Sequence, residues 1–295
     1  MDSENTINYA ELLKGISSKR LLPYNATFAI SSKKPELTMF CYTAHQDIAT
    51  KLCYVLHLVE INLRNNLNDS FKLFVKKDDW MKSIDLSHTS IEQLRQVQGR
   101  VWREFKEKNK KKNPTYDDHL SQLMFGFWVH LLKFPFNESS KLDINNFWTI
   151  YIDSVFPGRD GKDLNQIFNL LLQVKKTRDR FSHHEPLWKP STSKYEKPNA
   201  VVNFTHSIDY MLNLYDRELD CLKICQPEAL NYIHHIKHRE NFIQCCDRYK
   251  EQWELIRKRI KEMNHDNPDF PMFLGFEWQG AGLDGDHNVF FKEDG

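Results

Sequence analysis

The chain has 295 residues, of which 40% are hydrophobic and 13% aromatic, enough to build the core of one large domain or two smaller ones. Its 41 Lys and Arg nearly balance its 40 Asp and Glu, and the net charge of +1 excludes a protein that coats nucleic acid through its total charge. Any basic site must therefore be local.

The start of the chain is polar and acidic, which is not the pattern of a signal peptide. The most apolar stretch, LMFGFWVHLL (123–132), contains a histidine and is much shorter than the roughly 20 residues needed to span a bilayer. We therefore expect a cytoplasmic protein that does not interact with membranes. Six cysteines without a compact spacing pattern are interpreted as reduced thiols.

Helical periodicity dominates the chain, and regularly alternating strand patterns are scarce. A first long helix is expected at about 44–75, because apolar residues recur there at spacings of three and four. A second helix is expected to begin at the capping box formed by Thr89 and Glu92, and to end before Pro114. Its basic end, 106–112, is interpreted as a solvated helix end rather than as a contact for RNA.

A third helix is expected at 118–133, with Met124 among the residues of its apolar face. A fourth begins near Asp163 and ends between Ser182 and His184, and two more are expected near 201–223 and 228–264. The sequence therefore predicts an all-α protein with one helical domain, 1–265, and an irregular C-terminal tail, 266–295.

The fourth helix ends in an unusually polar stretch, RDRFSHHEPLW (178–188). Arg178 continues the apolar stripe of this helix, where an arginine is costly unless an anionic group meets it, and Glu60 on the first helix is the natural partner. His183 and His184 are then simple C-terminal caps. Alternatively, the helix end gathers an arginine and a histidine around one point, or two copies of the chain each contribute a set.

Five segments, in order, resemble the Abi-like proteins, bacterial abortive-infection proteins of the HEPN superfamily. They are ISSKRLLPYN (16–25), LHLVEINLRNNL (56–67), LMFGFWVHLL (123–132), Phe156-Pro157 and TRDRFSHHEPLW (177–188). Asp179 departs from the family pattern, which usually has Asn there. The chain from about 225 onward has no counterpart in this resemblance.

The resemblance implies a HEPN-type helical bundle with additional helices, and a metal-independent endoribonuclease without a cofactor. Its R-x(4–6)-H motif falls on Arg178 and His183, and His184 also fits the looser spacing. Asp179 would orient one of these groups. Three residues of the E-x-x-x-R-N pattern would form a supporting set, namely Glu60, Arg64 and Asn65.

The residue types suit this chemistry. An imidazole, which titrates near neutral pH in water, can take the proton of the RNA 2′-hydroxyl. A guanidinium offers planar, paired donors to the charge that develops on the phosphate. The resemblance further implies a homodimer in which the motif helices face each other, so that a histidine of the partner protomer protonates the leaving 5′-oxygen. The products would be a 2′,3′-cyclic phosphate and a 5′-hydroxyl.

The segment 175–197 carries seven Lys or Arg against three Asp or Glu, which gives it a net charge of +4. Lys175, Lys176 and Arg180 are therefore candidate RNA contacts. Nearby aromatic residues could stack on bases, namely Phe181, Trp188 and Tyr195. Taken singly, each of these is more often a core or interface residue.

Two other hypotheses remain. The chain could be a HEPN-like RNA-binding or partner-binding module without activity, or the toxin half of a toxin–antitoxin pair that an antitoxin restrains or a phage trigger releases. A metal site is a weaker alternative, because no known zinc spacing is matched by the cluster of His234, His235, His238, Cys245 and Cys246. The RNA substrate, a tRNA or a single strand, is not specified by the sequence.

Overall fold

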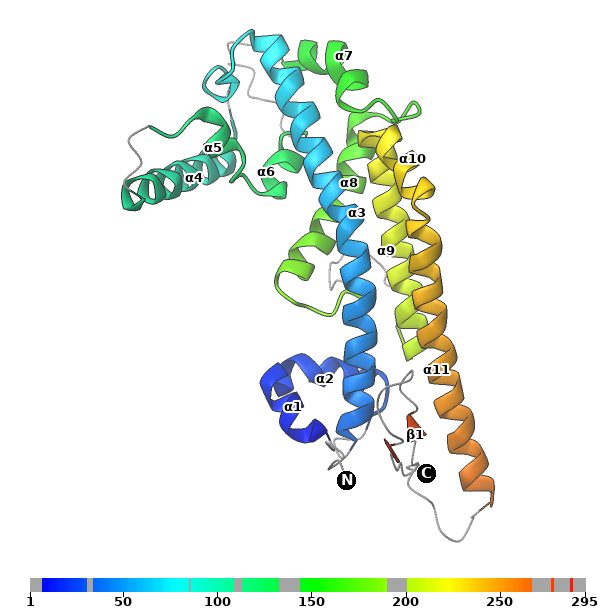
Figure 1. The fold of residues 1–295 in the computed structure, drawn as a ribbon. Helices are drawn as coiled ribbons and strands as arrows, with labels where there is room; N and C mark the ends of the chain where they lie inside the picture. Colours follow the sequence, from blue (N-terminus) through cyan, green and yellow to red (C-terminus); the bar gives the residue numbers. More distant parts are fainter. Residues whose placement is uncertain are drawn as a thin grey trace. The chain divides into compact units, whose positions relative to one another are not determined.

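The computed structural model describes residues 7–30, 34–84, 86–108, 113–132, 144–189, 201–266, 277–278 and 287–288. This part of the chain is all-α, apart from a 3₁₀ turn (Trp80–Lys82) and an antiparallel pair of two-residue strands, β1 (Glu277–Trp278) and β2 (His287–Asn288). The helices, shown in chain order in Figure 1, are α1 (Tyr9–Ile16), α2 (Ser18–Thr27), α3 (Pro35–Val75), α4 (His88–Glu107), α5 (Tyr116–Leu120), α6 (Phe125–His130), α7 (Ile144–Val155), α8 (Leu164–Ser182), α9 (Phe204–Cys225), α10 (Pro227–His235) and α11 (His238–Asp266).

The chain divides into two compact units; three of the boundaries fall inside α3, α8 and α9, and the fourth lies between α10 and α11. The first unit comprises Met1–Leu52, Arg180–Asn213 and His238–Gly295. The second comprises Cys53–Asp179 and Leu214–Lys237. No helix in the described ranges is both long enough and apolar enough to cross a membrane.

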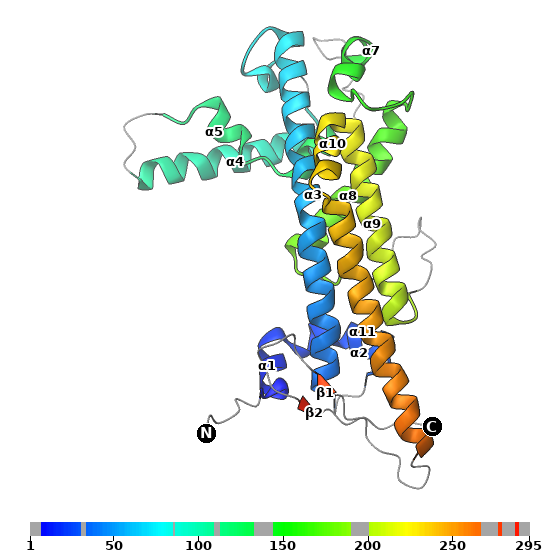
Figure 2. The same cartoon turned by 45° about the vertical axis from the view of Figure 1, so that its right-hand side comes forward.

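Aromatic side chains hold the first unit together. In this unit α11 lies alongside the first parts of α3 and α9 (Figure 2). Trp253 of α11 packs on Phe204 of α9, with ring centroids 4.8 Å apart, and stacks on Phe40 of α3. Such aromatic pairs contribute about 0.5–1.5 kcal/mol beyond the area that they bury.

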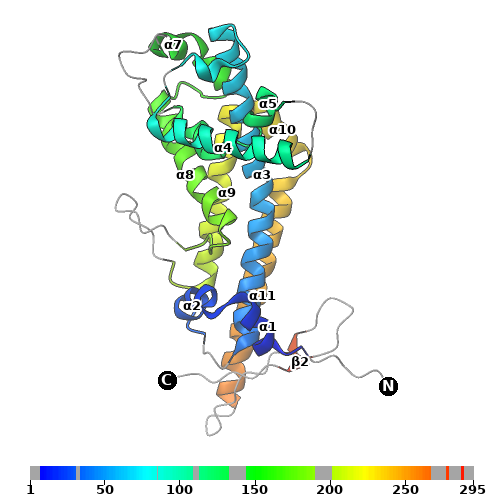
Figure 3. The same ribbon diagram turned by 90° about the vertical axis from the view of Figure 1, so that its left-hand side faces the viewer.

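The core of the second unit follows the apolar stripe of α3. Leu63, Leu67 and Phe71 are completely buried, and the Phe71 ring stacks between Trp80 and Phe147, at centroid distances of 4.4 and 4.1 Å. In the same unit α4 packs against α5 and α6, and Figure 3 shows α4 and α5 side by side.

A single amide joins the ends of two helices in the second unit. Asn66 Nδ2 donates to the carbonyl oxygen of Val155 at 2.9 Å and to that of Cys225 at 2.7 Å, so it bonds the last residues of α7 and α9. The chain after α7 approaches α9 so closely that a Cβ on Gly158 would lie 2.0 Å from the Lys223 carbonyl oxygen. Only glycine fits at this crossing.

Several predicted helices differ from the structure. The predicted helix 118–133 is wrong, because α5 and α6 are separate and Met124 between them is extended, with ψ 157°, and 55% exposed. The segment 125–129 is buried on every side, so it carries no single stripe from which a continuous helix could be inferred. The predicted helix 228–264 is likewise two helices, separated near Lys237, whose φ is +54°.

The ends of other helices also differ from those that the sequence predicted. The helix α3 begins at Pro35 rather than near Ala44. Ser87 caps α4 by accepting a hydrogen bond from Ser90 N at 3.1 Å, so the predicted capping box at Thr89 is wrong. The expected end of α8 is confirmed at Ser182. Three helices that the sequence did not predict are α1, α2 and α7. The predicted irregular tail, 266–295, lies outside the described residues except for Asp266, which ends α11, and the strand pair.

Candidate functional site

The helix α8 begins with a reciprocal cap. Gln166 N donates to Asp163 Oδ1 at 2.8 Å, and Asp163 N donates to Gln166 Oε1 at 3.0 Å. The helix then buries Ile167, Leu171 and Val174 along one stripe. Arg178 continues this stripe, as the sequence indicated, and its side chain is 26% exposed.

Arg178 is held by a carboxylate from α3. Its Nε donates to Glu60 Oε2 at 3.3 Å, which confirms the predicted pairing of these two residues. Its Nη1 also lies 3.9 Å from Asp179 Oδ1. The guanidinium therefore sits between two carboxylates, in a position where an incoming phosphate must compete with them.

A buried acid and a thiol lie close to this ion pair in the second unit. The pKa of Cys53 is raised by burial and by Glu218 nearby, while Arg178 opposes this shift. Glu218 itself is buried, and its oxygens accept no hydrogen bond among the described residues. Burial raises the pKa of Glu218 well above its usual range, which favours the neutral form of its carboxyl.

Asp179 is paired along its own helix. Its Oδ2 accepts a hydrogen bond from Lys175 Nζ at 2.6 Å. The Lys175 side chain passes over Gly126 of α6, where an added Cβ would lie 2.8 Å from Lys175 Cε. The charge of this candidate RNA contact is thus already engaged, while Lys176 on the same helix is partly exposed.

The end of α8 has the hydrogen bonds of a Schellman motif. His184 N donates to the Phe181 carbonyl and Glu185 N to that of Arg180, both at 2.9 Å. His184 occupies the left-handed position of this motif, with φ +54°, where glycine is the usual residue. The predicted role of the histidine segment as a helix end is confirmed.

Arg20 of α2 fixes the backbone of both histidines. Its Nη1 donates to the His184 carbonyl oxygen at 2.6 Å and to that of His183 at 3.3 Å. Both histidines are exposed to solvent. The backbone is thus held in place while both residues stay accessible to solvent, an arrangement that suits proton transfer to and from a ligand.

Arg180 donates its hydrogen bonds to the turn that follows α8. It donates to the carbonyl oxygens of Pro186, Leu187 and Lys189. Its side chain is only 19% exposed, and Nε lies 3.4 Å from Glu185 Oε2. Arg180 was a candidate RNA contact from the sequence, and these contacts give it a structural role in the turn.

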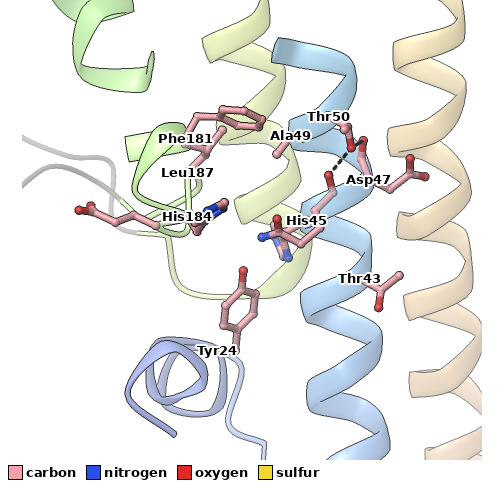
Figure 4. A pocket seen from close by; sticks show the side chains of 11 residues that line it. Tyr24, Thr43, His45, Asp47, Ala49, Thr50, Phe181, His184 and Leu187 are labelled. Atoms are coloured by element: carbon pink, nitrogen blue, oxygen red, sulfur yellow. Dashed lines mark hydrogen bonds between the residues drawn. The ribbon is translucent and has the colours of Figure 1, made fainter. Parts of the chain in front are cut away.

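A pocket of about 310 Å³ lies in the first unit, beside His184 (Figure 4). Figure 4 shows the Tyr24 hydroxyl directed toward His184 and His45, and this hydroxyl is buried without a hydrogen bond among the described residues. The remaining lining residues are Thr43, Gln46, Asp47, Ala49, Thr50, Phe181, Glu185 and Leu187.

His45, in the wall of this pocket, is a buried histidine that the sequence analysis missed. Its Nδ1 donates to the Cys41 carbonyl at 2.6 Å, and its Nε2 lies 2.6 Å from Ser207 Oγ. Burial lowers the pKa of His45 to about 3, so this ring is neutral. Its place on the stripe with Cys41, Ile48 and Leu52 is the signal that could have identified it as a core residue.

The other predicted residues contribute differently. Arg64 Nε donates to Asn65 Oδ1 at 3.4 Å along α3, and Asn65 is exposed. Among the candidate stacking aromatics, Trp188 is 1% exposed and belongs to the core, whereas Phe181 lines the pocket. Tyr195 lies outside the described residues, as does the basic part of the segment from residue 190 onward.

The candidate metal ligands lie in contrasting surroundings. His234 and His235 are exposed, whereas Cys245 and Cys246 are buried. Burial raises the pKa of Cys246 to about 12, and Cys245 Sγ donates to Asp47 Oδ2 at 3.4 Å. In the residues that the structure covers, no three His, Cys, Asp or Glu side chains are grouped to hold a metal ion.

No protein-family model matches the chain, and comparisons with curated proteins and with solved structures found no similar protein. A function for this chain must therefore be argued from its own residues.

Proposed function

We propose that this all-α protein is a cytoplasmic, metal-independent endoribonuclease of the HEPN type, with a HEPN-like helical bundle, that acts in abortive infection. The observation that carries the proposal is the arrangement along α8. A partly exposed arginine, fixed by a carboxylate of α3, precedes two solvent-exposed histidines whose backbone is held by Arg20. The spacing of Arg178 and His183 fits the R-x(4–6)-H pattern.

In this proposal the substrate supplies the nucleophile, its own 2′-hydroxyl. His183 removes the hydroxyl proton, and the attack on phosphorus releases the 5′-oxygen, which takes a proton from the histidine of a partner protomer. Arg178 stabilises the negative charge on the phosphate as the two bonds exchange. Asp179 and Glu60 position Arg178, and no metal or cofactor is required.

The two histidines are not equivalent. The left-handed backbone of His184 is a cap conformation, and its side chain lines the pocket beside Tyr24. His183 has neither of these structural duties. This difference supports His183 as the catalytic histidine and gives His184 a supporting role.

The surroundings of Arg178 favour a restrained enzyme. A guanidinium that faces Glu60 and Asp179 is largely neutralised until RNA or a conformational change displaces a carboxylate. A dormant toxin that an antitoxin restrains, or that a phage trigger releases, would have this property. Dimerisation through the motif helices would then complete the site with residues of the partner protomer.

The test is cleavage of a tRNA pool and of a single-stranded oligomer in the presence of EDTA. Wild type is expected to produce 2′,3′-cyclic phosphate ends, while Arg178→Ala and His183→Ala are inactive. His235→Ala, which removes an exposed histidine of α10, is the matched control and should cut like wild type. Cleavage that survives in His183→Ala would overturn the assignment of His183.

The same ion pairs also support a second candidate, a HEPN-like module that binds RNA or a partner without cutting. A guanidinium locked between two carboxylates would serve structure alone. The two candidates differ in cells, because expression of the nuclease should be toxic and the toxicity should depend on Arg178 and His183. Toxicity that both substitutions leave intact, with RNA bound but never cut, would favour the module.

A further inference from the structure

A groove of about 410 Å³ runs along α4 in the second unit, against the segment that joins α5 and α6. Its volume falls within the range of sites that hold small molecules. Its lining residues are Gln93, Gln96, Val97, Gly99, Arg100, Arg103, Leu123 and Met124.

The charge of the groove is positive. Arg100 and Arg103 are both exposed, and none of the residues that line the groove carries a carboxylate. Arg100 Nη2 donates to the Gln122 carbonyl and Arg103 Nε to the Gly99 carbonyl, each at 3.3 Å. Because both acceptors are neutral, these hydrogen bonds do not offset the positive charge of the two arginines. Residues 93–108 carry five Lys or Arg against two Glu, a net charge of +3 in a chain whose total is +1.

The shape of the groove leaves room for a ligand. A Cβ placed on Gly99 would meet nothing within 4 Å, so the helix surface is open there. Met124 is 55% exposed at the groove, and Trp102, three residues after Gly99, is 43% exposed on the adjacent side of α4. Exposed apolar and aromatic groups beside arginines are typical of surfaces that bind single-stranded nucleic acid, where phosphates pair with cations and bases stack.

We propose that this groove binds single-stranded RNA, with Arg100 and Arg103 on its phosphates and Trp102 and Met124 against its bases. The choice of RNA rests on the proposed nuclease function. The groove offers exposed cationic contacts, whereas two of the candidate contacts on α8 are already engaged. Lys175 is paired with Asp179. Arg180, similarly, is bonded to backbone carbonyls.

The test measures binding of a short fluorescein-labelled oligouridylate by anisotropy, in a His183→Ala background that prevents cleavage. The double variant Arg100→Gln, Arg103→Gln is expected to bind about tenfold more weakly. The slope of log K against log salt should become shallower by about 1.4, because two phosphate contacts are lost on a single strand.

Matched controls separate a groove from a general charge effect. Arg257→Gln with Arg259→Gln removes the same charge from the exposed face of α11 and should bind like the parent. Gly99→Leu fills the groove without changing charge and should weaken binding, whereas Gly99→Ala, whose Cβ meets open space, should not. Both substitutions favour the helix, so loss of folding is not expected.

Several results would overturn the proposal. They are a parent protein that does not bind the oligomer, groove variants that bind like the parent, an equal loss in the α11 control, or a polyglutamate peptide that binds as tightly and competes. Cleavage is measured separately on the otherwise wild-type proteins. Absent cleavage with groove-dependent binding would reject the nuclease alone, and cleavage with groove-independent binding would reject the groove alone.

Discussion

Arg178 and Glu60 form an ion pair between residues 118 positions apart, with Nε 3.3 Å from Oε2. Both side chains keep a little contact with solvent, 26% and 20% exposed. The pair is therefore neither a surface salt bridge, which contributes little, nor a fully buried one, whose desolvation would be costly. It fixes the direction of the guanidinium while leaving one side accessible.

Replacing the carboxylate tests this positioning role. Glu60→Gln should lower the rate of RNA cleavage by up to about 100-fold, because the guanidinium loses its fixed direction. Arg178→Ala should lower it at least as much, by about 100- to 1000-fold, because the phosphate loses a donor. Asp69→Asn, an exposed carboxylate on the same helix, is the control. Single-turnover rates with saturating RNA separate this effect from weaker binding. If the double variant Glu60→Gln, Arg178→Ala loses no more activity than Arg178→Ala alone, the two residues act as one unit.

Removing Arg20 tests the support of the histidine backbone. Arg20→Ala should lower the free energy of unfolding by about 1–2 kcal/mol, because two carbonyl oxygens at the end of α8 lose a charged donor. The neighbouring exposed residue offers a control, Lys19→Ala, which should change it by less than about 0.5 kcal/mol. Chemical denaturation measures both, and equal effects of the two substitutions would contradict the role of Arg20.

Glycine substitutions distinguish the two histidines. His184→Gly should raise stability by up to about 1 kcal/mol, because the left-handed backbone at φ +54° is strained for histidine. This variant should retain cleavage, whereas His183→Gly should lose it. Thermal unfolding and the cleavage assay are read on the same samples. A His184→Gly protein that is folded, stable and inactive would transfer the catalytic role to His184.

Burial of His45 predicts a dependence of stability on pH. Its pKa is lowered to about 3 in the folded protein, while an unfolded histidine titrates near 6.5. The unfolded chain therefore binds an extra proton between these values, and stability falls as the pH falls below about 6.5. Between pH 7 and pH 5 the loss from this group is about 2 kcal/mol.

The measurement compares denaturation of wild type and His45→Gln at pH 7 and pH 5. The variant should be less stable at pH 7 but should lose about 2 kcal/mol less on going to pH 5. The exposed histidine of α9, His206, provides the control, and His206→Gln should lose as much as wild type. An equal pH dependence in all three proteins would show that His45 is not neutral in the folded state.

The sequence predicts those features that depend on one helix at a time. The stripe of α8, its end at Ser182 and the need for a carboxylate beside Arg178 all follow from helical spacing and from the cost of burying a charge. Glu60 could be named because it borders the stripe of α3. Whether these residues cut RNA stays a prediction.

Features that depend on packing between distant segments were not predictable in this way. Nothing in the local pattern indicates that Arg20 reaches the end of α8, since its partners are backbone carbonyls 163 and 164 residues away. Glu218 lies at helical spacing between Leu214 and Leu222, which could have marked it as buried. The break between α5 and α6 could not be predicted, because residues 125–129 of α6 are buried on all sides and show no single apolar stripe.

Asn66 restrains two helix ends in the second unit through one side chain. Its amide donates one hydrogen bond to the carbonyl oxygen of Val155 and another to that of Cys225, so opening the last turn of α7 or of α9 breaks a bond to the same residue. The amide protons of both turns should therefore exchange slowly with deuterium while Asn66 is in place. In Asn66→Ala both sets should exchange faster, so that a single substitution on α3 loosens the ends of two other helices.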